Sequence, residues 1–153
     1  MIKIIAVDRI KDKNIKNLID IYLKRMVSRL KVDILEVTPS KYETFDKIDK
    51  AKEIESDKIL SLCKKEEMII TLDESGVLVS SVDFAKLIFE TLNYKHVTCI
   101  IGGAYGLSRN LIGQADNVIS LSKMTLTHEM ARLVLVEQIY RAYTIYCGIK
   151  YHN

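Results

Sequence analysis

Short apolar runs alternate along this chain with stretches in which apolar residues recur every three or four positions. A short apolar run is typical of a buried strand, and the three-to-four spacing is typical of a helix with one apolar face. Strands and helices that follow one another in this way predict an α/β fold, in which helices cover a mainly parallel sheet. The 153 residues contain no linker or internal repeat, so we expect residues 1–153 to form a single domain.

The apolar pattern also predicts where these elements lie. Strands are expected at residues 1–7, 32–37, 68–72, 97–101 and 118–119, and helices at about 15–30, 45–64, 84–92, 109–115 and 128–146. Ser80, Ser81 and Asp83 offer a start for the third helix, and Ser108 and Thr127 can cap the last two, because a side-chain oxygen accepts hydrogen bonds from free backbone N–H groups. The polar sequence Asp73 to Gly76 is expected to close the third strand as a turn.

Composition and cysteine usage limit the class of protein. The chain is 48% hydrophobic and 28% charged, and it has neither an apolar run near 18 residues nor a basic leader with a cleavage site. We therefore expect a cytoplasmic protein without a membrane segment. Cys63, Cys99 and Cys147 are odd in number and lack CxxC spacing, which favours buried free thiols over disulfides or a metal site.

The net charge of +3 excludes a polycation that coats nucleic acid, but the charge is unevenly distributed. Residues 1–41 hold 10 Lys and Arg against 5 Asp and Glu, and residues 97–153 hold 5 against 3. If the two ends share a face, that face could bind phosphates; the alternative is an ordinary solvated helix surface.

A ligand site is expected where the strands end, because parallel sheets bind ligands at the carboxyl edge. Leu72 and Asp73 follow one strand, GGAYG at residues 102–106 follows another, and a hydroxyl-rich segment at 120–127 follows a third. Glycines let the backbone approach a ligand, and small hydroxyls beside apolar side chains suit an adenosine-like molecule. Neither GxGxxG nor a P-loop is present. The glycines alone are more typical of a tight strand-to-helix turn, and the hydroxyls alone can simply cap a helix or satisfy turn backbone. Only the order of the segments favours a site.

Four segments carry a resemblance to a known family. IITLDESG (69–76), IIGGAYGLS (100–108), SLSKMTLTHEMARLVLVEQIYRAY (120–143) and the terminal YHN resemble the RlmH (YbeA-like) 23S rRNA pseudouridine N3-methyltransferases of the SPOUT class. The similarity extends over essentially the full length and is most specific in the last third. One departure is Asp8–Arg9, where a glycine and a lysine are expected.

The resemblance implies a SPOUT-type α/β domain with a C-terminal trefoil knot, a homodimer, and S-adenosylmethionine as the cofactor, with no metal. It implies that the enzyme methylates N3 of a pseudouridine in 23S rRNA of the assembled 70S ribosome. By matching motif, the methyl donor is expected to contact Leu72, Gly103, Ser122, Lys123, Met124, Thr125, Leu126 and Thr127.

Methylation of a uracil-type N3 requires that the nitrogen lose its proton, so a cation or a general base is expected beside it. Arg141, Tyr151 and His152 are the candidates for this catalytic role. Arg141 could stabilise the anion or simply pair with Glu137 one turn earlier. His152 could accept the proton or belong to a frayed terminus, and Tyr151 could stack on the base.

Two other functions remain open from the residues alone. One is a noncatalytic RNA-binding or ribosome-assembly protein that keeps the fold and the basic ends. The other is a nucleotide-dependent enzyme that acts on a small metabolite. Binding of S-adenosylmethionine would separate the methyltransferase from the first of these, and a requirement for rRNA would separate it from the second.

Overall fold

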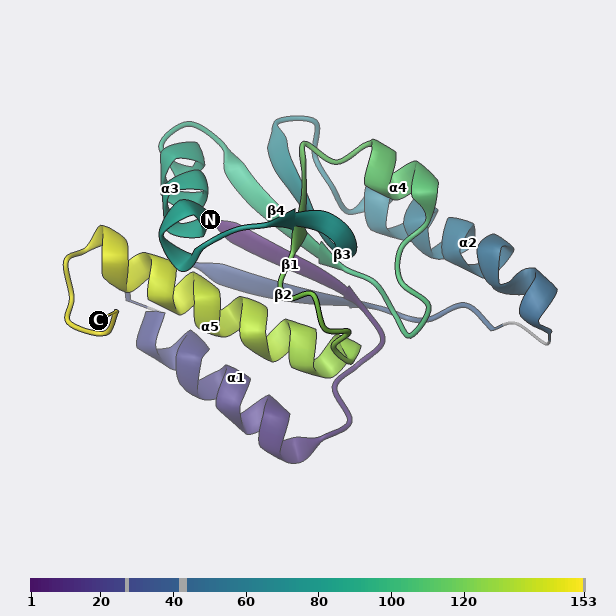
Figure 1. Ribbon diagram of the computed structural model, residues 1–153, viewed down its shortest axis with the longest axis horizontal. Helices are drawn as coiled ribbons and strands as arrows, with labels where there is room; N and C mark the ends of the chain where they lie inside the picture. Colours follow the sequence, from purple (N-terminus) through teal and green to yellow (C-terminus); the bar gives the residue numbers. More distant parts are fainter. Residues whose placement is uncertain (27, 42–43, 153) are drawn as a thin grey trace.

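The sheet observed in a computed structural model, which describes residues 1–26, 28–41 and 44–152, is parallel throughout. In this part of the chain five strands pair in the order β2-β1-β4-β3-β5 (Figure 1). They are β1 (Ile2–Val7), β2 (Val32–Val37), β3 (Glu67–Leu78), β4 (His96–Ile101) and β5 (Asn117–Ser120). The N-terminal strand therefore lies inside the sheet, and the predicted parallel arrangement is confirmed.

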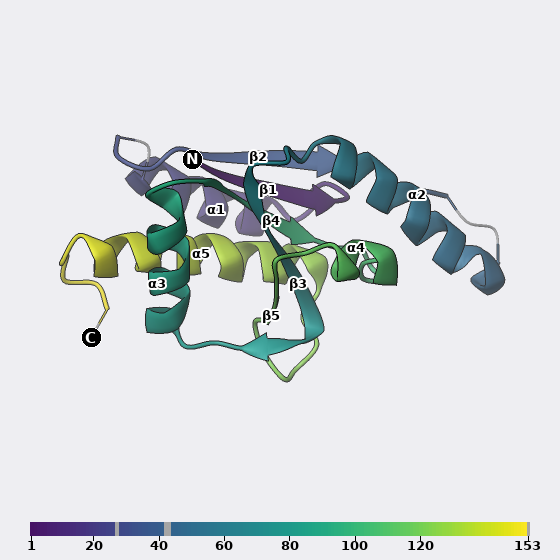
Figure 2. The same ribbon diagram turned by 90° about the horizontal axis from the view of Figure 1, so that it is seen from above.

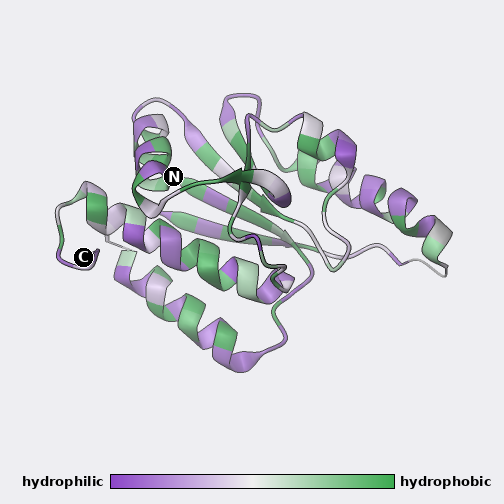
Figure 3. Cartoon of the chain, in the orientation of Figure 1, coloured by the Kyte–Doolittle hydropathy of each residue, from purple (hydrophilic) through white to green (hydrophobic). Residues whose placement is uncertain are grey.

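Helices cover both faces of the sheet. They are α1 (Lys13–Met26), α2 (Ile48–Ser61), α3 (Ser81–Leu92), α4 (Arg109–Gly113) and α5 (His128–Tyr146), with a short 3-10 helix η1 (Phe45–Lys47) before α2. Helices α1, α3 and α5 lie on one face, and α2 and α4 lie on the other (Figures 1 and 2). Ile4 of β1 is buried in the core under α1, α3 and α5, whereas the next residue, Ile5, is buried in the core under α2 and α4. This explains why the strands are continuous apolar runs. By contrast, α2 is largely hydrophilic along its length (Figure 3).

The helix starts agree with the capping residues expected from the sequence. Ser80, Ser108 and Thr127 each accept a hydrogen bond from the backbone N–H three residues later. Asp12 does the same for α1, since its carboxylate accepts from the backbone N–H groups of Asn14 and Ile15 at 2.7 and 3.1 Å. These bonds fix where α4 and α5 begin, and α5 begins directly at the predicted ligand segment.

Two expectations about element ends were wrong. Asp73 to Gly76 does not close β3; the strand continues to Leu78, and the four residues form an irregularity in which Leu72 and Val77 both pair with Ile119. A Cβ atom on Gly76 would lie 2.6 Å from the backbone carbon of Ile119, so the glycine allows β3 to pass β5 closely. The first helix ends at Met26 rather than continuing to Leu30, although Leu30 is buried in the same core.

A buried ion pair ties together the amino ends of three strands. Lys3 of β1 donates to both carboxylate oxygens of Glu67 at 2.8 and 2.9 Å and to the carbonyl of Leu62 at 2.9 Å. Glu67 also accepts from the hydroxyl of Thr98 at 2.8 Å and the backbone N–H of Lys64 at 3.2 Å. Burial alone would raise the pKa of Glu67, but these hydrogen bonds outweigh it and lower the pKa below its ordinary value.

None of the helices in residues 1–26, 28–41 and 44–152 has the length and apolar character needed to span a bilayer.

Candidate functional site

A cavity of about 440 Å³ lies at the carboxyl edge of the sheet, where the sequence predicted a ligand site. Its wall is formed by the irregular middle part of β3, by the segments after β4 and β5, by the first turn of α5 and by one residue of α2. The lining residues are Lys52, Leu72, Asp73, Glu74, residues 101–107, Ser120, Leu121, Ser122, Met124, Thr125, Leu126, His128 and Ala131. Three segments distant in sequence thus meet at one edge, as expected for a parallel sheet.

Six of the eight residues expected to contact the methyl donor line this cavity: Leu72, Gly103, Ser122, Met124, Thr125 and Leu126. Lys123 is exposed and lies outside the wall. Thr127 also lies outside it, because its side chain caps α5 by accepting from the N–H of Met130 at 3.3 Å. The structure therefore brings the predicted donor segments together, although the side chains of Lys123 and Thr127 do not line the cavity.

The glycine loop after β4 folds back on itself. The carbonyl of Gly103 accepts from the N–H of Gly106 at 3.1 Å, and Gly106 has a φ of 74°. A Cβ atom on Gly102 would lie 2.6 Å from the backbone carbon of Gly106, and one on Gly103 would lie 3.0 Å from a methyl group of Val7. Glycine at 102 and 103 is thus required by the tight loop and by the end of β1, so larger side chains would distort the cavity wall from behind.

The hydroxyls of the segment after β5 bond to its own backbone. Ser120 donates to the carbonyl of Ser122 at 2.8 Å, and the hydroxyl of Ser122 accepts from the N–H of Met124 at 2.9 Å. These bonds hold the segment in one conformation and leave other backbone groups of the loop available to a ligand. The side chain of Met124 is 78% exposed.

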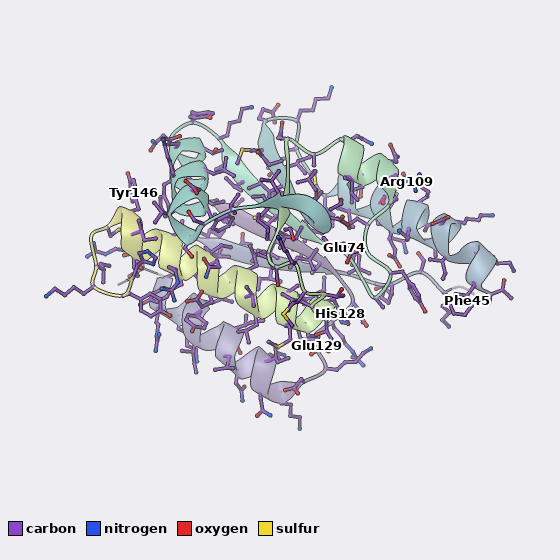
Figure 4. All side chains as sticks on the ribbon, viewed as in Figure 1. Phe45, Glu74, Arg109, His128, Glu129 and Tyr146 are labelled. Atoms are coloured by element: carbon purple, nitrogen blue, oxygen red, sulfur yellow. The ribbon has the colours of Figure 1, made fainter. Side chains whose placement is uncertain are left out.

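The sequence did not predict three charged or titratable residues that line the cavity. Glu74 of β3 and His128 at the start of α5 both line the cavity (Figure 4). Lys52 comes from α2, whose charged pattern gives no signal of a site. Its position is fixed by a buried hydroxyl pair, in which Ser56 lies 2.7 Å from Ser108 and also donates to the carbonyl of Lys52 at 2.8 Å. Since Ser108 caps α4, this pair links α2 to the element that follows the glycine loop.

The start of α5 also fixes the loop between β1 and α1. Glu129 accepts from the backbone N–H groups of Lys11 and Asp12 at 3.2 and 3.1 Å. Arg132 is fully buried and donates to the carbonyl of Asp8 and to Glu36, both at 2.7 Å. Asp8, at the unexpected first position of this loop, has a φ of 67°, and a hydrogen bond from Lys11 lowers the pKa of its carboxyl. The departure from the expected glycine is thus accommodated by local polar contacts.

Arg141, Tyr151 and His152 lie together at the far end of α5. Glu137 joins the first two, since it accepts from Arg141 at 2.5 Å and from the Tyr151 hydroxyl at 3.1 Å. The guanidinium of Arg141 lies 4.8 Å from the centre of the Tyr151 ring and 3.5 Å from Nδ1 of His152. The hydrogen bond that Arg141 donates to Glu137 raises the pKa of Arg141, and burial raises the pKa of Tyr151. His152 is exposed.

The cavity and this acceptor cluster, which we define as Glu137, Arg141, Tyr151 and His152, are far apart within one chain. His128 lines the cavity and Arg141 lies thirteen residues later on the same helix. At 1.5 Å per residue the separation along the axis is about 20 Å. In both orientations the C-terminus lies beside the end of α5 that is opposite to its start (Figures 1 and 2).

Among the residues that the structure describes, no group of three or more His, Cys, Asp or Glu side chains is placed to hold a metal ion.

An all-parallel sheet with a cavity at its carboxyl edge, built from the irregular part of β3 and the loops after β4 and β5, defines an α/β domain of the kind that binds nucleotide-like ligands. The chain belongs to the SPOUT methyltransferase family: a family model described as "Predicted SPOUT methyltransferase" matches residues 1–152. The resemblance inferred from the motifs is thereby confirmed.

Full-length relatives carry a more specific name. The chain is 39% identical to a protein of Caldicellulosiruptor bescii, covering all of both chains. It is 40% identical to one of Lactobacillus acidophilus, covering 99% of each, and 41% identical to one of Dictyoglomus thermophilum, covering 99% of this chain and 98% of the other. Each of the three is named ribosomal RNA large subunit methyltransferase H.

Methyltransferases of this family use S-adenosylmethionine, and the cavity fits that molecule. Its volume of about 440 Å³ falls in the range of small-molecule sites. The wall carries the carboxylates of Asp73 and Glu74 and the ammonium of Lys52. S-adenosylmethionine carries two positive groups and one carboxylate, so each of its charges has a counterpart in the wall.

Proposed function

We propose that this protein is an S-adenosylmethionine-dependent methyltransferase that methylates N3 of a pseudouridine in 23S rRNA of the assembled 70S ribosome. The main support for this proposal is the cavity at the carboxyl edge of the sheet, where the predicted donor segments meet. The chain also belongs to a family of methyltransferases. The names of the full-length relatives support rRNA of the large subunit as the substrate. A ribosomal substrate would place the enzyme in the cytoplasm.

The cavity residues would hold the donor, and the acceptor cluster would hold the base. S-adenosylmethionine bound in the cavity would supply an electrophilic methyl group on a positively charged sulfur. Arg141 gives one N–H group to Glu137, and its remaining N–H donors would stabilise the anionic form of N3. His152 is the exposed member of the cluster, which supports our proposal that it accepts the N3 proton. Tyr151 holds the tail, since its hydroxyl is bonded to Glu137.

We further propose a homodimer in which the tail of one subunit completes the donor cavity of the other. The separation of about 20 Å along α5 prevents one chain from bringing both groups to the same atom. A groove between α1 and α5 is lined by Leu18, Tyr22, Leu133, Val134 and Glu137. Leu18 and Met130 are 45% and 39% exposed, although both are apolar. Because Glu137 belongs to both groove and cluster, a partner seated in the groove would lie against the cluster.

The single-domain organisation of residues 1–153 and the C-terminal trefoil knot remain part of this proposal. Continuity of one sheet from β1 to β5 supports a single domain.

A methyl-transfer assay tests the function directly. Purified protein and S-adenosylmethionine labelled in the methyl group are incubated with intact ribosomes, with free rRNA, and with ribosomes lacking the pseudouridine. We expect label in 23S rRNA only from pseudouridine-containing ribosomes. Labelling independent of pseudouridine would refute the proposed target, and donor binding without transfer to any RNA would favour a noncatalytic RNA-binding protein.

Mixing two inactive variants tests the shared site. Gly106→Val is expected to distort the cavity, because a β-branched residue cannot adopt a φ of 74° without strain. His152→Ala removes the proposed proton acceptor. If the tail acts across the dimer, an equal mixture refolded together should regain about a quarter of wild-type activity, since half the dimers are mixed and each has one intact site. No recovery would show that each tail serves its own chain.

A further inference from the structure

The two charged side chains of the acceptor cluster, Glu137 and Arg141, form an ion pair with each other. The carboxylate of Glu137 accepts from Arg141, from Tyr151 and, through its second oxygen, from the side-chain amide of Gln138 at 2.7 Å. The Glu137–Arg141 pair therefore has no net charge. A polyanion such as RNA gains its affinity from cations that are not neutralised by the protein. The cluster as described supplies little of that attraction, so a further cation beside it is needed.

Arg25, in the last turn of α1, provides such a cation next to the cluster. Its guanidinium lies 5.6 Å from the centre of the Tyr22 ring and 5.7 Å from that of Tyr140. Tyr140 in turn meets the Tyr151 ring edge-on at a centroid distance of 4.8 Å. An arginine of α1 is thus connected to the tail through a single aromatic ring, which joins the basic N-terminal helix to the C-terminal end of α5.

The environment of Arg25 leaves its hydrogen-bonding groups available. The residue is exposed, and among the described residues no Asp or Glu lies within ion-pair distance of it. The two tyrosine rings, themselves 5.6 Å apart, attract the guanidinium and restrict its orientation. A planar guanidinium held in this way loses little freedom when it forms two parallel hydrogen bonds to a phosphate.

We propose that Arg25 binds a backbone phosphate of the RNA next to the nucleotide that enters the acceptor cluster. The inference rests on the proposed function, since it names a residue that recognises the same substrate. Arg25 sets the position of the RNA, and Arg141 and His152 act on the base. An acidic protein surface is the alternative partner for an exposed arginine. An unchanged KM for ribosomes in Arg25→Gln would favour that alternative.

Steady-state methylation of intact ribosomes, at saturating S-adenosylmethionine and several salt concentrations, tests the role of Arg25. For Arg25→Gln we expect KM for ribosomes to rise roughly tenfold, as for loss of a hydrogen bond to a charged group. The slope of log KM against log salt should fall by about one. Donor affinity, measured by calorimetry, should not change. Arg25→Lys keeps the charge and loses the planar guanidinium. Its KM for ribosomes should lie between the values for wild type and Arg25→Gln.

Lys24→Gln is the matched control, because it removes the same charge from the neighbouring exposed position. We expect its KM to stay within about twofold of wild type, since one unspecific surface charge contributes little at physiological salt. Equal effects of the two substitutions would overturn the inference in favour of general electrostatics. A packing role on the tyrosine rings alone would lower the melting temperature of Arg25→Gln and leave KM and its salt slope unchanged. If the wild-type protein methylates no RNA, the proposed function itself fails, which is visible before the variants are compared.

Discussion

At the scale of single residues, the close approach of β3 and β5 depends on the absence of one side chain. A Cβ atom on Gly76 would lie 2.6 and 2.8 Å from backbone atoms of residues 119 and 120. Both neighbours are backbone, so neither can rotate away as a flexible side chain would. The segment after β5 forms a wall of the cavity, and any shift of β5 moves it.

Gly76→Ala is therefore expected to lower the melting temperature and to weaken donor binding. Gly113→Ala is the matched control, because nothing lies within 4 Å of a Cβ atom there and the residue ends α4. Alanine at a helical position should leave the free energy of unfolding unchanged or raise it by up to about 1 kcal/mol. Thermal unfolding and calorimetric titration with S-adenosylmethionine measure both effects. Equal stability of the two variants would contradict the close packing of β3 on β5.

The three cysteines should differ sharply in reactivity. All three are free, as expected, but only Cys99 is fully buried, and burial raises the pKa of its thiol to about 12. Cys63 is half-buried with a raised pKa, and Cys147 is exposed, which corrects the expectation that all would be buried. Because the thiolate is the reactive form, iodoacetamide at neutral pH should label Cys147 first, Cys63 slowly and Cys99 only after unfolding. Peptide mass spectrometry over time measures this order, and early labelling of Cys99 would contradict its burial.

At the scale of elements, the ion pair between Lys3 and Glu67 joins β1, β3 and β4 at their amino ends. Each charge is compensated by several hydrogen bonds in a buried setting, so loss of one partner leaves the other without its counter-charge. Breaking such a pair costs about 3–5 kcal/mol, whereas replacing both members by apolar residues is far less costly.

Glu67→Gln should therefore lower the free energy of unfolding by about 3 kcal/mol. Lys3→Met combined with Glu67→Leu should be less destabilising than either single change. Glu66→Gln, at the neighbouring exposed position, is the control and should have little effect. Urea unfolding of Glu67→Gln, Lys3→Met, Glu67→Leu, the double variant and Glu66→Gln measures these differences. A double variant less stable than both single variants would show that the pair itself stabilises the fold.

The same pair predicts a pH dependence. The pKa of Glu67 is lower in the folded chain than its ordinary value of 4.5, so its ionised form favours folding. This contribution is complete above about pH 4.5 and is lost as the pH falls through the folded pKa. Wild-type stability should therefore decline below that pH more steeply than the stability of Glu67→Gln. Parallel pH profiles of the two proteins would exclude Glu67 as a source of the acid sensitivity.

The positions of the elements could be predicted from the sequence where local signals are strong. The predictions failed where contacts with a distant segment determine the structure. Caps at Ser80, Ser108 and Thr127 are local side-chain-to-backbone contacts, and all three were predicted. The polar residues Asp73 to Gly76 imitate a turn, yet pairing with β5, more than 40 residues later, keeps them within β3. Nothing in the sequence indicated that Lys52 lines the cavity, because only the packing of α2 beside Ser108 brings Lys52 there.

At the scale of the whole molecule, activity should depend on the dimer. Leu18 is 45% exposed and lines the groove between α1 and α5 without contacting the cavity. Leu18→Asp should place a charge in the proposed interface and yield a monomer that binds S-adenosylmethionine normally but does not methylate ribosomes. Analytical ultracentrifugation and calorimetry measure the two properties. Leu23 is a partly buried residue of the same helix, so Leu23→Ala controls for general loss of stability. An active Leu18→Asp monomer would refute the shared site.

The strand order has a consequence for how the chain is made. β1 pairs on one side with β2, about thirty residues away, but on the other with β4, where Ile2 is aligned with Val97. A nascent chain shorter than about 100 residues therefore exposes one edge of an entirely buried, apolar strand. Such long-range pairing is slow to form. Synthesis must be nearly two-thirds complete before the N-terminal strand can be enclosed on both sides, so the order of the strands sets a late point in translation at which this sheet can first close.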